Sequence, residues 1–445
     1  MAESSIEVSK QHQNRRRRLM RAMGRNSIAI LPTAVISARN NDVEYPFRHN
    51  SDFYYLTGFE EPRAVMVLIP GRPEGEFILF CRERDPQMEL WNGRRAGLEG
   101  AREIYGADVA YPIEALDEYL PALLENRDRI HYTLGSDPDF DRRISWWMKQ
   151  AKRKSRAGVH VPAELVSLEH LVHEMRLFKD REEAALMRHA AQISAAAHSR
   201  AMMVCRPGMM EYQLEAELVH EFMSHGARSV AYSSIVGGGA NACVLHYTSN
   251  DAMLRDGDLV LIDAGAEYRG YASDITRTFP VNGRFTEAQR ELYDLVLEAQ
   301  LAAIAKVKPG NCWNDPHDTA VRVLTKGMVE LGLLKGDVSK LISEGEYRRF
   351  YMHRTGHWLG MDVHDVGEYM SGEQWRKLEP GMVLTIEPGI YVAAGSKGVA
   401  KRWWNIGIRI EDDVLVTRGG CEVLTRDVPK DADEIEALMA SQRAA

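Results

Sequence analysis

Two nine-residue stretches, Gly257–Gly265 (GDLVLIDAG) and Gly381–Gly389 (GMVLTIEPG), align with each other without a gap. Each is an apolar run of strand length followed by a carboxylate, Asp263 in the first stretch and Glu387 in the second. A carboxylate at the end of an apolar strand is costly to bury unless a positive charge compensates it. The stretches therefore predict a duplicated unit that presents two equivalent carboxylates to a cation. The alternative is that two common strand-plus-glycine patterns coincide.

The helices expected before these strands repeat in the same order. A helical pattern over Glu182–Val204 stops at Arg206-Pro207-Gly208, and a second over Thr286–Val307 stops at Lys308-Pro309-Gly310. Pro and Gly are strong stop signals for a helix. Another helical stretch follows each break. The region from 175 to 445 is therefore expected to contain one helix–helix–hairpin unit used twice.

The segment before that region has a different pattern. Short apolar runs at Ser27–Leu31, Ala64–Ile69 and Glu76–Arg82 alternate with helix-compatible stretches, which is typical of an α/β domain. We therefore expect two domains, 1–174 with an α/β fold and 175–445 with an α+β fold. The run Arg15–Arg18 is expected to be a solvated helix face, and binding of a polyanion is the alternative.

Composition narrows the class of protein. The chain has 445 residues, of which 45% are hydrophobic and 27% charged, as in ordinary globular proteins. The mean hydropathy is −0.34, and the apolar runs are too short to span a bilayer. A formal charge of −8 gives no support for a nucleic-acid partner. Five cysteines without a CxxC pair predict free thiols, and hence a cytoplasmic protein.

Four acids share an unusual setting in strands that otherwise look buried. Asp263 and Asp274 are eleven residues apart on the two arms of a predicted hairpin, where like charges repel unless a divalent cation lies between them. Glu387 follows an apolar run, and Glu411 ends the run IGIRIE, where alternation places it on the same face as Arg409. Taken together, the four carboxylates predict a metal site.

Histidines accompany these acids. His353, His357 and His364 lie within twelve positions, between glycines that allow a close backbone approach, and His246 is a fourth candidate. One neutral imidazole and four carboxylates make an oxygen-rich ligand set. Such a set suits manganese or another first-row divalent ion. A structural zinc site instead favours Cys and His ligands. Two ions sharing a bridging hydroxide would activate it and polarise a carbonyl, which is hydrolase chemistry.

At these residues the sequence resembles the aminopeptidase P (Xaa-Pro aminopeptidase) family of pita-bread metallopeptidases, whose relatives include prolidase, creatinase and methionine aminopeptidase. The stretch MHRTGHWLGMDVHDVG, which includes His353, is its most specific motif. The resemblance implies a pita-bread fold with internal pseudo-twofold duplication, and two Mn²⁺, with Co²⁺ or Zn²⁺ as alternatives. The implied metal ligands are Asp263, Asp274, His357, Glu387 and Glu411.

The resemblance also implies roles for individual ligands and their neighbours. Asp263 would bind one metal, His357 and Glu387 the other, and Asp274 and Glu411 would bridge them. The implied catalytic residues are Glu387 as a proton shuttle, the histidines His246, His353 and His364 that line the substrate site, and Arg409 beside the cluster. Arg354 and Thr355 stand where the family pattern varies, and we expect them to affect only the rim.

The N-terminal region matches the same family. The stretch YPFRHNSDFYYLTGFEEP (45–62) resembles the amino-terminal domain of aminopeptidase P. Trp91 matches a tryptophan that in the family reaches a neighbouring subunit's active site, so the resemblance implies a homotetramer built as a dimer of dimers. An ordinary core position is the alternative for Trp91. Tyr232 and Tyr391 match substrate-site tyrosines of the family.

The expected activity is removal of the first residue from peptides with proline at the second position. Three alternatives remain at this point: a prolidase restricted to Xaa-Pro dipeptides, a metal-independent creatinase-like amidine hydrolase, and a non-catalytic peptide-binding scaffold. Retention of all five ligand positions argues against the last two.

Overall fold

The computed structural model describes the backbone of residues 2–441 and the side chains of residues 10–441. The chain divides into two compact units between Met175 and Arg176. Each unit has its own hydrophobic core. Among the described residues, no helix has both the length and the apolar character needed to cross a bilayer.

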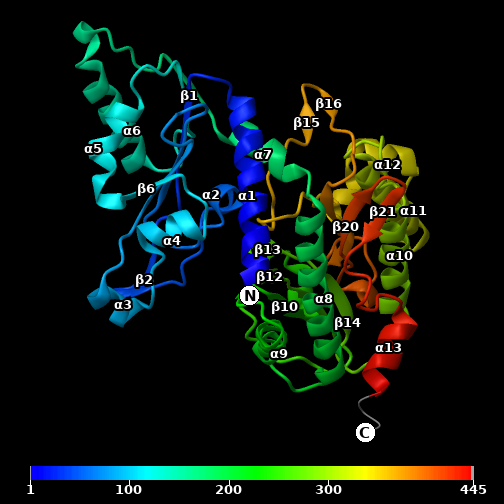
Figure 1. The fold of residues 1–445 in the computed structure, drawn as a ribbon. Helices are drawn as coiled ribbons and strands as arrows, with labels where there is room; N and C mark the ends of the chain where they lie inside the picture. The colour runs from blue at the N-terminus through cyan, green and yellow to red at the C-terminus, as the bar shows by residue number, and fades with distance from the viewer. Residues whose placement is uncertain (1, 442–445) are drawn as a thin grey trace. The chain divides into compact units, whose positions relative to one another are not determined.

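The first unit is built on a mixed six-stranded sheet in the order β6-β5-β4-β1-β7-β8. Its strands are β1 (Ser27–Pro32), β4 (Val65–Leu68), β5 (Phe77–Cys81), β6 (Val109–Pro112), β7 (Arg129–His131) and β8 (Glu164–Val166), and β2 (Ala38–Asn40) and β3 (Val43–Glu44) form a separate hairpin. Its helices are α1 (Ala2–Met23), α2 (Ser51–Thr57), α3 (Pro86–Asn92), α4 (Gly97–Glu103), α5 (Leu116–Leu123), α6 (Pro138–Lys152) and α7 (Glu169–Leu177), the last of which extends across the boundary (Figure 1). The α/β prediction is confirmed.

The arginine run on α1 differs from its prediction as a solvated face. Arg15 and Arg16 are buried, and Arg16 donates to the carbonyl of Leu56 at 2.8 Å while its guanidinium carbon lies 3.9 Å from the centroid of the Phe77 ring. Arg17 and Arg18 are exposed. A guanidinium can be buried where carbonyl oxygens and an aromatic face replace water. The sequence does not reveal this, because those partners lie far along the chain.

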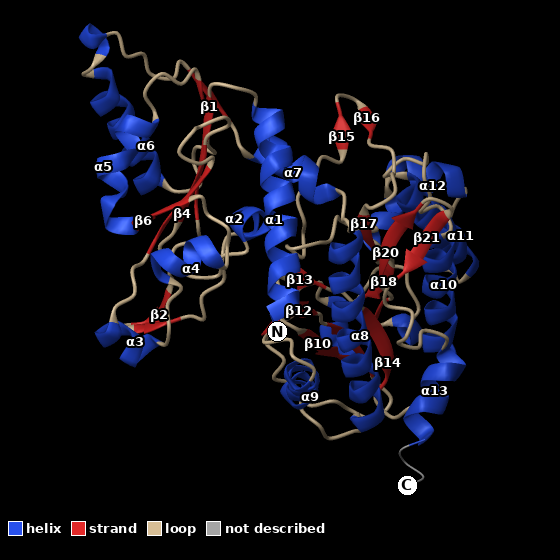
Figure 2. Cartoon of the chain, in the orientation of Figure 1, coloured by secondary structure: helices blue, strands red, loops and turns tan. Residues whose placement is uncertain are grey.

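The second unit contains the predicted duplication. In its first half α8 (Arg181–Val204) and α9 (Glu211–Ser224) precede the antiparallel pair β11 (Leu259–Asp263) and β14 (Thr276–Pro280). In its second half α10 (Glu287–Ile304) and α11 (Asp315–Glu330) precede the pair β17 (Val383–Ile386) and β20 (Asp412–Thr417). The helices surround the strands (Figure 2). The remaining elements are β9 (Ser229–Val230), β10 (Ile235–Gly238), β12 (Ala266–Tyr268), β13 (Tyr271–Ala272), α12 (Val338–Glu344), β15 (Met370–Ser371), β16 (Gln374–Trp375), β18 (Gly389–Val392), β19 (Ile406–Arg409), β21 (Gly420–Val423) and α13 (Ala432–Ser441).

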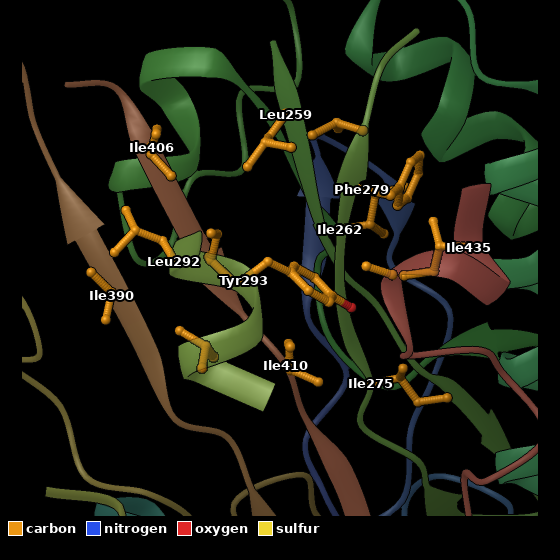
Figure 3. Packing of buried hydrophobic residues seen from close by; sticks show 14 of the residues in the cluster. Leu259, Ile262, Ile275, Phe279, Leu292, Tyr293, Ile390, Ile406, Ile410 and Ile435 are labelled. Atoms are coloured by element: carbon orange, nitrogen blue, oxygen red, sulfur yellow. The ribbon is translucent and has the colours of Figure 1, made fainter. Parts of the chain in front are cut away.

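The largest core cluster joins the two halves of this unit. Ile262 of β11 and Phe279 of β14 pack with Leu292 of α10, Ile408 of β19 and Ile435 of α13, and all five are fully buried (Figure 3 shows part of the cluster). Burial on this scale stabilises by roughly 1.5–3 kcal/mol for each large apolar side chain. Two halves tied together in this way hold the ends of β11 and β19 in fixed positions.

Candidate metal centre

The first two candidate ligands come from the β11–β14 pair. Asp263 is the last residue of β11 and lies opposite Thr276, the first residue of β14, while Asp274 stands two residues before β14. Both acids are buried, with 9% of Asp263 and 5% of Asp274 exposed. The hydroxyl of Tyr232 donates to Oδ1 of Asp263 at 2.6 Å and lies equally close to Oδ1 of Asp274. The hairpin therefore brings the two acids together, as predicted.

The other two acids come from the equivalent half. Glu387 follows the last residue of β17, and its backbone N–H donates to the carbonyl of Thr355 at 2.8 Å. Glu411 lies between β19 and β20, and its Oε2 accepts from the hydroxyl of Thr276 at 2.6 Å. The sequence suggested that Glu411 lies within a strand, whereas β19 ends at Arg409. The side chain still reaches the same site, because Thr276 of the other half holds it.

His357 completes the candidate set. Its Nε2 lies 3.4 Å from Oδ2 of Asp274 and 3.8 Å from Oε1 of Glu387. Its Nδ1 lies 2.9 Å from the carbonyl of Trp358, which fixes the ring by donation from Nδ1 and leaves Nε2 facing the acids. Ligand atoms of Asp274, His357 and Glu411 all lie within 4.8 Å of one another. This arrangement suits a histidine that would bind a metal through Nε2.

The electrostatics of the acid cluster are unfavourable in the protein alone. Burial raises the pKa of Glu411 well above its usual range, and the charges of Asp274 and Glu387 raise it further. Burial also raises the pKa of Glu387 to about 7. The pKa of Asp263 is raised by burial, although the charge of Arg409 opposes the shift. These carboxylates resist ionisation where they lie, because too little positive charge surrounds them.

Arg409 brings a positive charge to this cluster. Its Nη2 donates to Oδ2 of Asp263 at 2.6 Å, its Nη1 to the hydroxyl of Tyr391 at 3.0 Å, and its Nε to the hydroxyl of Thr276 at 3.0 Å. One guanidinium thus faces four carboxylates. The donor set is hard and oxygen-rich, and it fits divalent cations, which would supply the missing positive charge.

The predicted substrate-site residues line one cavity of about 650 Å³ together with the five candidate ligands. Those residues are Tyr232, His246, His353, His364 and Arg409. Nε2 of His353 lies 2.9 Å from the hydroxyl of Tyr391, and the ring centroid of His364 lies 4.4 Å from that of His357. Tyr391 is buried against this wall through its contacts with His353 and Arg409.

Trp91 belongs to the other unit. It lies on α3, and its side chain is 82% exposed, beside Leu90, which is 84% exposed. The alternative of an ordinary core position is therefore wrong. An exposed tryptophan and leucine side by side are uncommon on a surface that meets only water.

Three residues that position the candidate ligands were not predicted from the sequence. Thr276 donates to Glu411, the hydroxyl of Thr385 lies 3.3 Å from Oε1 of Glu387, and Oδ2 of Asp413 accepts from the backbone N–H of Asp274 at 3.1 Å. A strand alternates its faces, so Thr385 and Glu387, two residues apart, share one face. That signal was available for Thr385. The contact between Thr276 and Glu411 joins residues 135 positions apart and leaves no local signal.

The fold and the site together define a metal-dependent hydrolase of the peptidase class. Residues 185–418 match metallopeptidase family M24, and residues 12–132 match the aminopeptidase P N-terminal domain. The chain belongs to metallopeptidase family M24, in the group that carries the aminopeptidase P N-terminal domain. It is therefore a pita-bread enzyme of a family that uses divalent metal cofactors.

Individual relatives cover almost the whole chain. The Xaa-Pro aminopeptidase of Escherichia coli is 48% identical over 98% of this chain and 99% of its own length. The human Xaa-Pro aminopeptidase 3 is 36% identical over 90% of this chain and 78% of its own length. A solved aminopeptidase of Pseudomonas aeruginosa is 58% identical, with a TM-score of 0.97 over 98% of this chain and 99% of the other.

Proposed function

We propose that this chain is an Xaa-Pro aminopeptidase that releases the first residue from peptides with proline at the second position. One observation carries the proposal: three buried carboxylates, the half-buried Glu387 and His357 converge in a cavity large enough for a peptide, and Arg409 donates to one of the acids. The full-length similarity to enzymes named for this activity supports the same conclusion.

Asp263, Asp274, His357, Glu387 and Glu411 would hold two divalent ions, for which Mn²⁺ is proposed and Co²⁺ or Zn²⁺ are alternatives. When bound, such ions polarise a carbonyl and lower the pKa of a water molecule, so that it attacks at neutral pH. The resemblance favours Asp263 on one ion, His357 and Glu387 on the other, and Asp274 and Glu411 shared between them.

Glu387 is proposed as the proton shuttle. Its backbone is fixed by Thr355 and its side chain by Thr385, so the carboxylate has a defined position at the cavity wall. The buried site holds its pKa at about 7 in the protein alone. A carboxylate held at this wall can take a proton from the attacking water and deliver it to the proline nitrogen.

The histidines are proposed to bind the reacting carbonyl and the substrate backbone. Burial and the charge of Arg409 lower the pKa of His353 to about 3, so the ring is neutral at pH 7 and can both donate and accept. Nδ1 of His353 lies 2.7 Å from the carbonyl of Arg354 and Nε2 lies beside Tyr391, which fixes the ring. His364 and His246 would stabilise the developing oxyanion, as preorganised donors do elsewhere.

The proposed selectivity follows from the chemistry of proline. An Xaa-Pro bond has no N–H, so the site need not satisfy that donor, and apolar packing can select the ring. The free amino terminus of the substrate would lie near the acids and set the register. Tyr232 and Tyr391 are proposed as substrate-binding residues on this wall.

A homotetramer, arranged as a dimer of dimers, and a cytoplasmic location complete the proposal. Exposure of Trp91 and Leu90 supports a role for this surface in subunit contacts, with Trp91 reaching a neighbouring subunit's site. The N-terminal domain, proposed to span residues 1–174, would then serve oligomerisation and substrate gating, and 175–445 catalysis. All five cysteines are free thiols, which supports a reducing compartment.

The test uses metal-stripped protein restored with Mn²⁺, Co²⁺ or Zn²⁺. We expect metal-dependent release of the first residue from Xaa-Pro-Yaa tripeptides. Cleavage confined to Xaa-Pro dipeptides would establish a prolidase instead. Peptide binding without turnover under any metal would establish a non-catalytic scaffold and overturn the proposal.

A further inference from the structure

The N-terminal unit contains a hollow of about 770 Å³, within the size range of small-molecule sites. It lies between the last turns of α1, the Pro70–Gly71 turn and the segment before β7. The charged side chains that line it are those of Arg17, Arg21, Arg25, Arg127 and Glu76. Four guanidinium groups therefore share the hollow with one carboxylate, in a chain whose net charge is −8.

The arginines of this hollow lack compensation within the described chain. Arg17 and Arg21 are four residues apart on α1, a spacing at which like charges destabilise a helix, and Arg25 lies four residues further on. In the described part of the chain, none of these arginines forms an ion pair. Glu76, the one carboxylate among the lining residues, already accepts a hydrogen bond at Oε1 from the backbone N–H of Gly71, at 2.6 Å.

Arg127 gives a second, independent indication. Its Nε is buried and has no hydrogen-bond partner among the described residues. Burial lowers the pKa of Arg127, and the charge of Arg72 lowers it further. A buried N–H without an acceptor costs free energy that a bound acceptor would restore.

We propose that this hollow binds a compact polyanion with adjacent phosphate groups. Guanidinium groups match phosphate oxygens through paired N–H donors, and several arginines around one hollow match several neighbouring phosphates better than a single one. Inorganic oligophosphate and the triphosphate of a nucleotide share this chemistry. The site is separate from the metal centre, because all of its lining residues belong to the first unit.

The test is calorimetric titration of the full chain with inorganic tripolyphosphate and with ATP at low salt. We expect saturable binding of tripolyphosphate that Arg21→Glu weakens by at least about 10-fold, the scale of one charge-assisted hydrogen bond. Arg18→Glu is the matched control: Arg18 is exposed on the same helix, does not line the hollow, and its replacement should weaken binding by less than about 3-fold.

The ATP arm identifies the source of the phosphates. Tighter binding of ATP than of tripolyphosphate, with the same sensitivity to Arg21→Glu, would assign the site to a nucleotide, and equal binding would assign it to the phosphates alone. Three results would overturn the proposal: no binding of either ligand, equal weakening by both variants, or binding of a single-stranded oligonucleotide without binding of tripolyphosphate.

A different observation at the metal cavity carries a second inference. Arg354 is exposed at the cavity wall, donates to Oδ1 of Asn314, and holds its guanidinium carbon 5.0 Å from the centroid of the Trp375 ring on β16. These two contacts hold the guanidinium in place. In the described part of the chain no carboxylate pairs with it, whereas Arg409, the other arginine of the cavity, is engaged by Asp263.

We infer that Arg354 binds a carboxylate of the substrate beyond the proline, either the free carboxyl terminus of a tripeptide or an acidic side chain. This inference rests on the proposed function, which supplies the peptide. It predicts a preference for short or acidic peptides that comes from substrate binding, since Arg354 does not contact the reacting bond. Exposed charge pairs of this kind contribute little, so the expected preference is modest.

The test compares an Xaa-Pro-Ala free acid with its carboxyl-terminal amide, and Xaa-Pro-Glu amide with Xaa-Pro-Gln amide. We expect the wild type to favour each carboxylate about 3- to 10-fold in KM at unchanged kcat. Arg354→Gln should remove the preference, and Arg348→Gln, an exposed arginine outside the cavity, should retain it.

The two arms separate the sources of the carboxylate. A preference for the free acid alone assigns Arg354 to the carboxyl terminus, and a preference for Glu over Gln assigns it to an acidic side chain. Cleavage without either preference, or a preference that survives Arg354→Gln, overturns this inference and leaves the proposed function intact. No cleavage of any Xaa-Pro peptide overturns both.

Discussion

Glu411 and Asp412 are consecutive, both are buried, and their surroundings are opposite. Asp412 accepts from Nη2 of Arg277 at 2.8 Å and from Nζ of Lys430 at 2.6 Å. Burial raises the pKa of Asp412, yet these cations prevail and lower it to about 2. Glu411 is surrounded by other acids and accepts a hydrogen bond from Thr276, and its pKa is raised well above the usual range.

This contrast shows that buried acids in this chain differ in whether nearby side chains compensate their charge. Asp412 has a structural role, and its compensating cations are side chains of the chain itself, Arg277 and Lys430. Where carboxylates gather with too few cations, as around Glu411, the arrangement suits bound divalent ions. Because the two residues are neighbours in the chain, their opposite pKa shifts must come from the side chains that the fold places around each of them.

The largest expected effect is on catalysis, after a substitution in the acid cluster that contains Glu411. Glu387→Gln should lower kcat for an Xaa-Pro-Yaa peptide by at least about 10³-fold, because a proton shuttle contributes 10²- to 10⁴-fold and a metal ligand is also lost. Steady-state kinetics at saturating Mn²⁺ measure this. Glu379→Gln, an exposed acid eight residues earlier, should have no effect, and retained activity of the Glu387 variant would exclude it as the shuttle.

The second prediction concerns stability and removes the compensated acid, Asp412. Asp412→Ala should destabilise the chain by about 3–5 kcal/mol, because it leaves Arg277 buried without its carboxylate. Denaturant unfolding of the metal-free protein measures the change. A loss below about 1 kcal/mol would show that backbone carbonyls alone satisfy Arg277.

A third prediction concerns His198, a fully buried base of α8. Its Nε2 lies 2.9 Å from the carbonyl of Ala264, and burial lowers its pKa to about 4. Below about pH 6.5 the unfolded chain binds a proton at this histidine and the folded chain does not, so stability falls as the pH falls, until about pH 4.

The expected loss is about 3 kcal/mol across that interval, from 1.36 kcal/mol for each pKa unit. Unfolding between pH 4 and 7 with chelator present should show a shallower pH dependence in His198→Gln than in the wild type. His225→Gln, an exposed histidine, is the control and should follow the wild type. Identical slopes for all three proteins would mean that His198 is protonated in the folded state.

The smallest effect has the opposite sign to that of Asp412. Glu411→Gln should leave the metal-free protein unchanged or stabilise it by about 1 kcal/mol, because one acid is removed from a group of like charges. Chelator-treated wild type and variant are compared by denaturant unfolding. Destabilisation comparable to that of Asp412→Ala would mean that the two acids do not differ as described.

Much of this arrangement could be predicted from local patterns. The duplicated strands predicted Asp263 and Glu387 as site residues, and the hairpin predicted Asp274. Strand alternation predicted that Arg409 and Glu411 lie on the same face. The helix bounds also follow closely, since the predicted helix Glu182–Val204 is α8, Arg181–Val204. Apolar periodicity and stop signals are properties of short windows, so a sequence reveals them directly.

The compensation of each acid could not be predicted. The sequence reads Ile410-Glu411-Asp412-Asp413, three consecutive acids with no sign of which one meets a cation. Arg277 is 135 residues from Asp412, and the partners of Arg16 lie on α2 and β5. Such pairings depend on tertiary packing, which local patterns do not encode.

The most direct test of the central claim is the number of ions bound by the metal-stripped chain. Equilibrium dialysis against Mn²⁺, read by elemental analysis, should give two ions per chain in the wild type and in Arg354→Gln, with return of Xaa-Pro-Yaa cleavage. Glu411→Gln should bind fewer than two and remain inactive. Activity in the fully stripped wild type, or the same metal content in wild type and Glu411→Gln, would contradict the account.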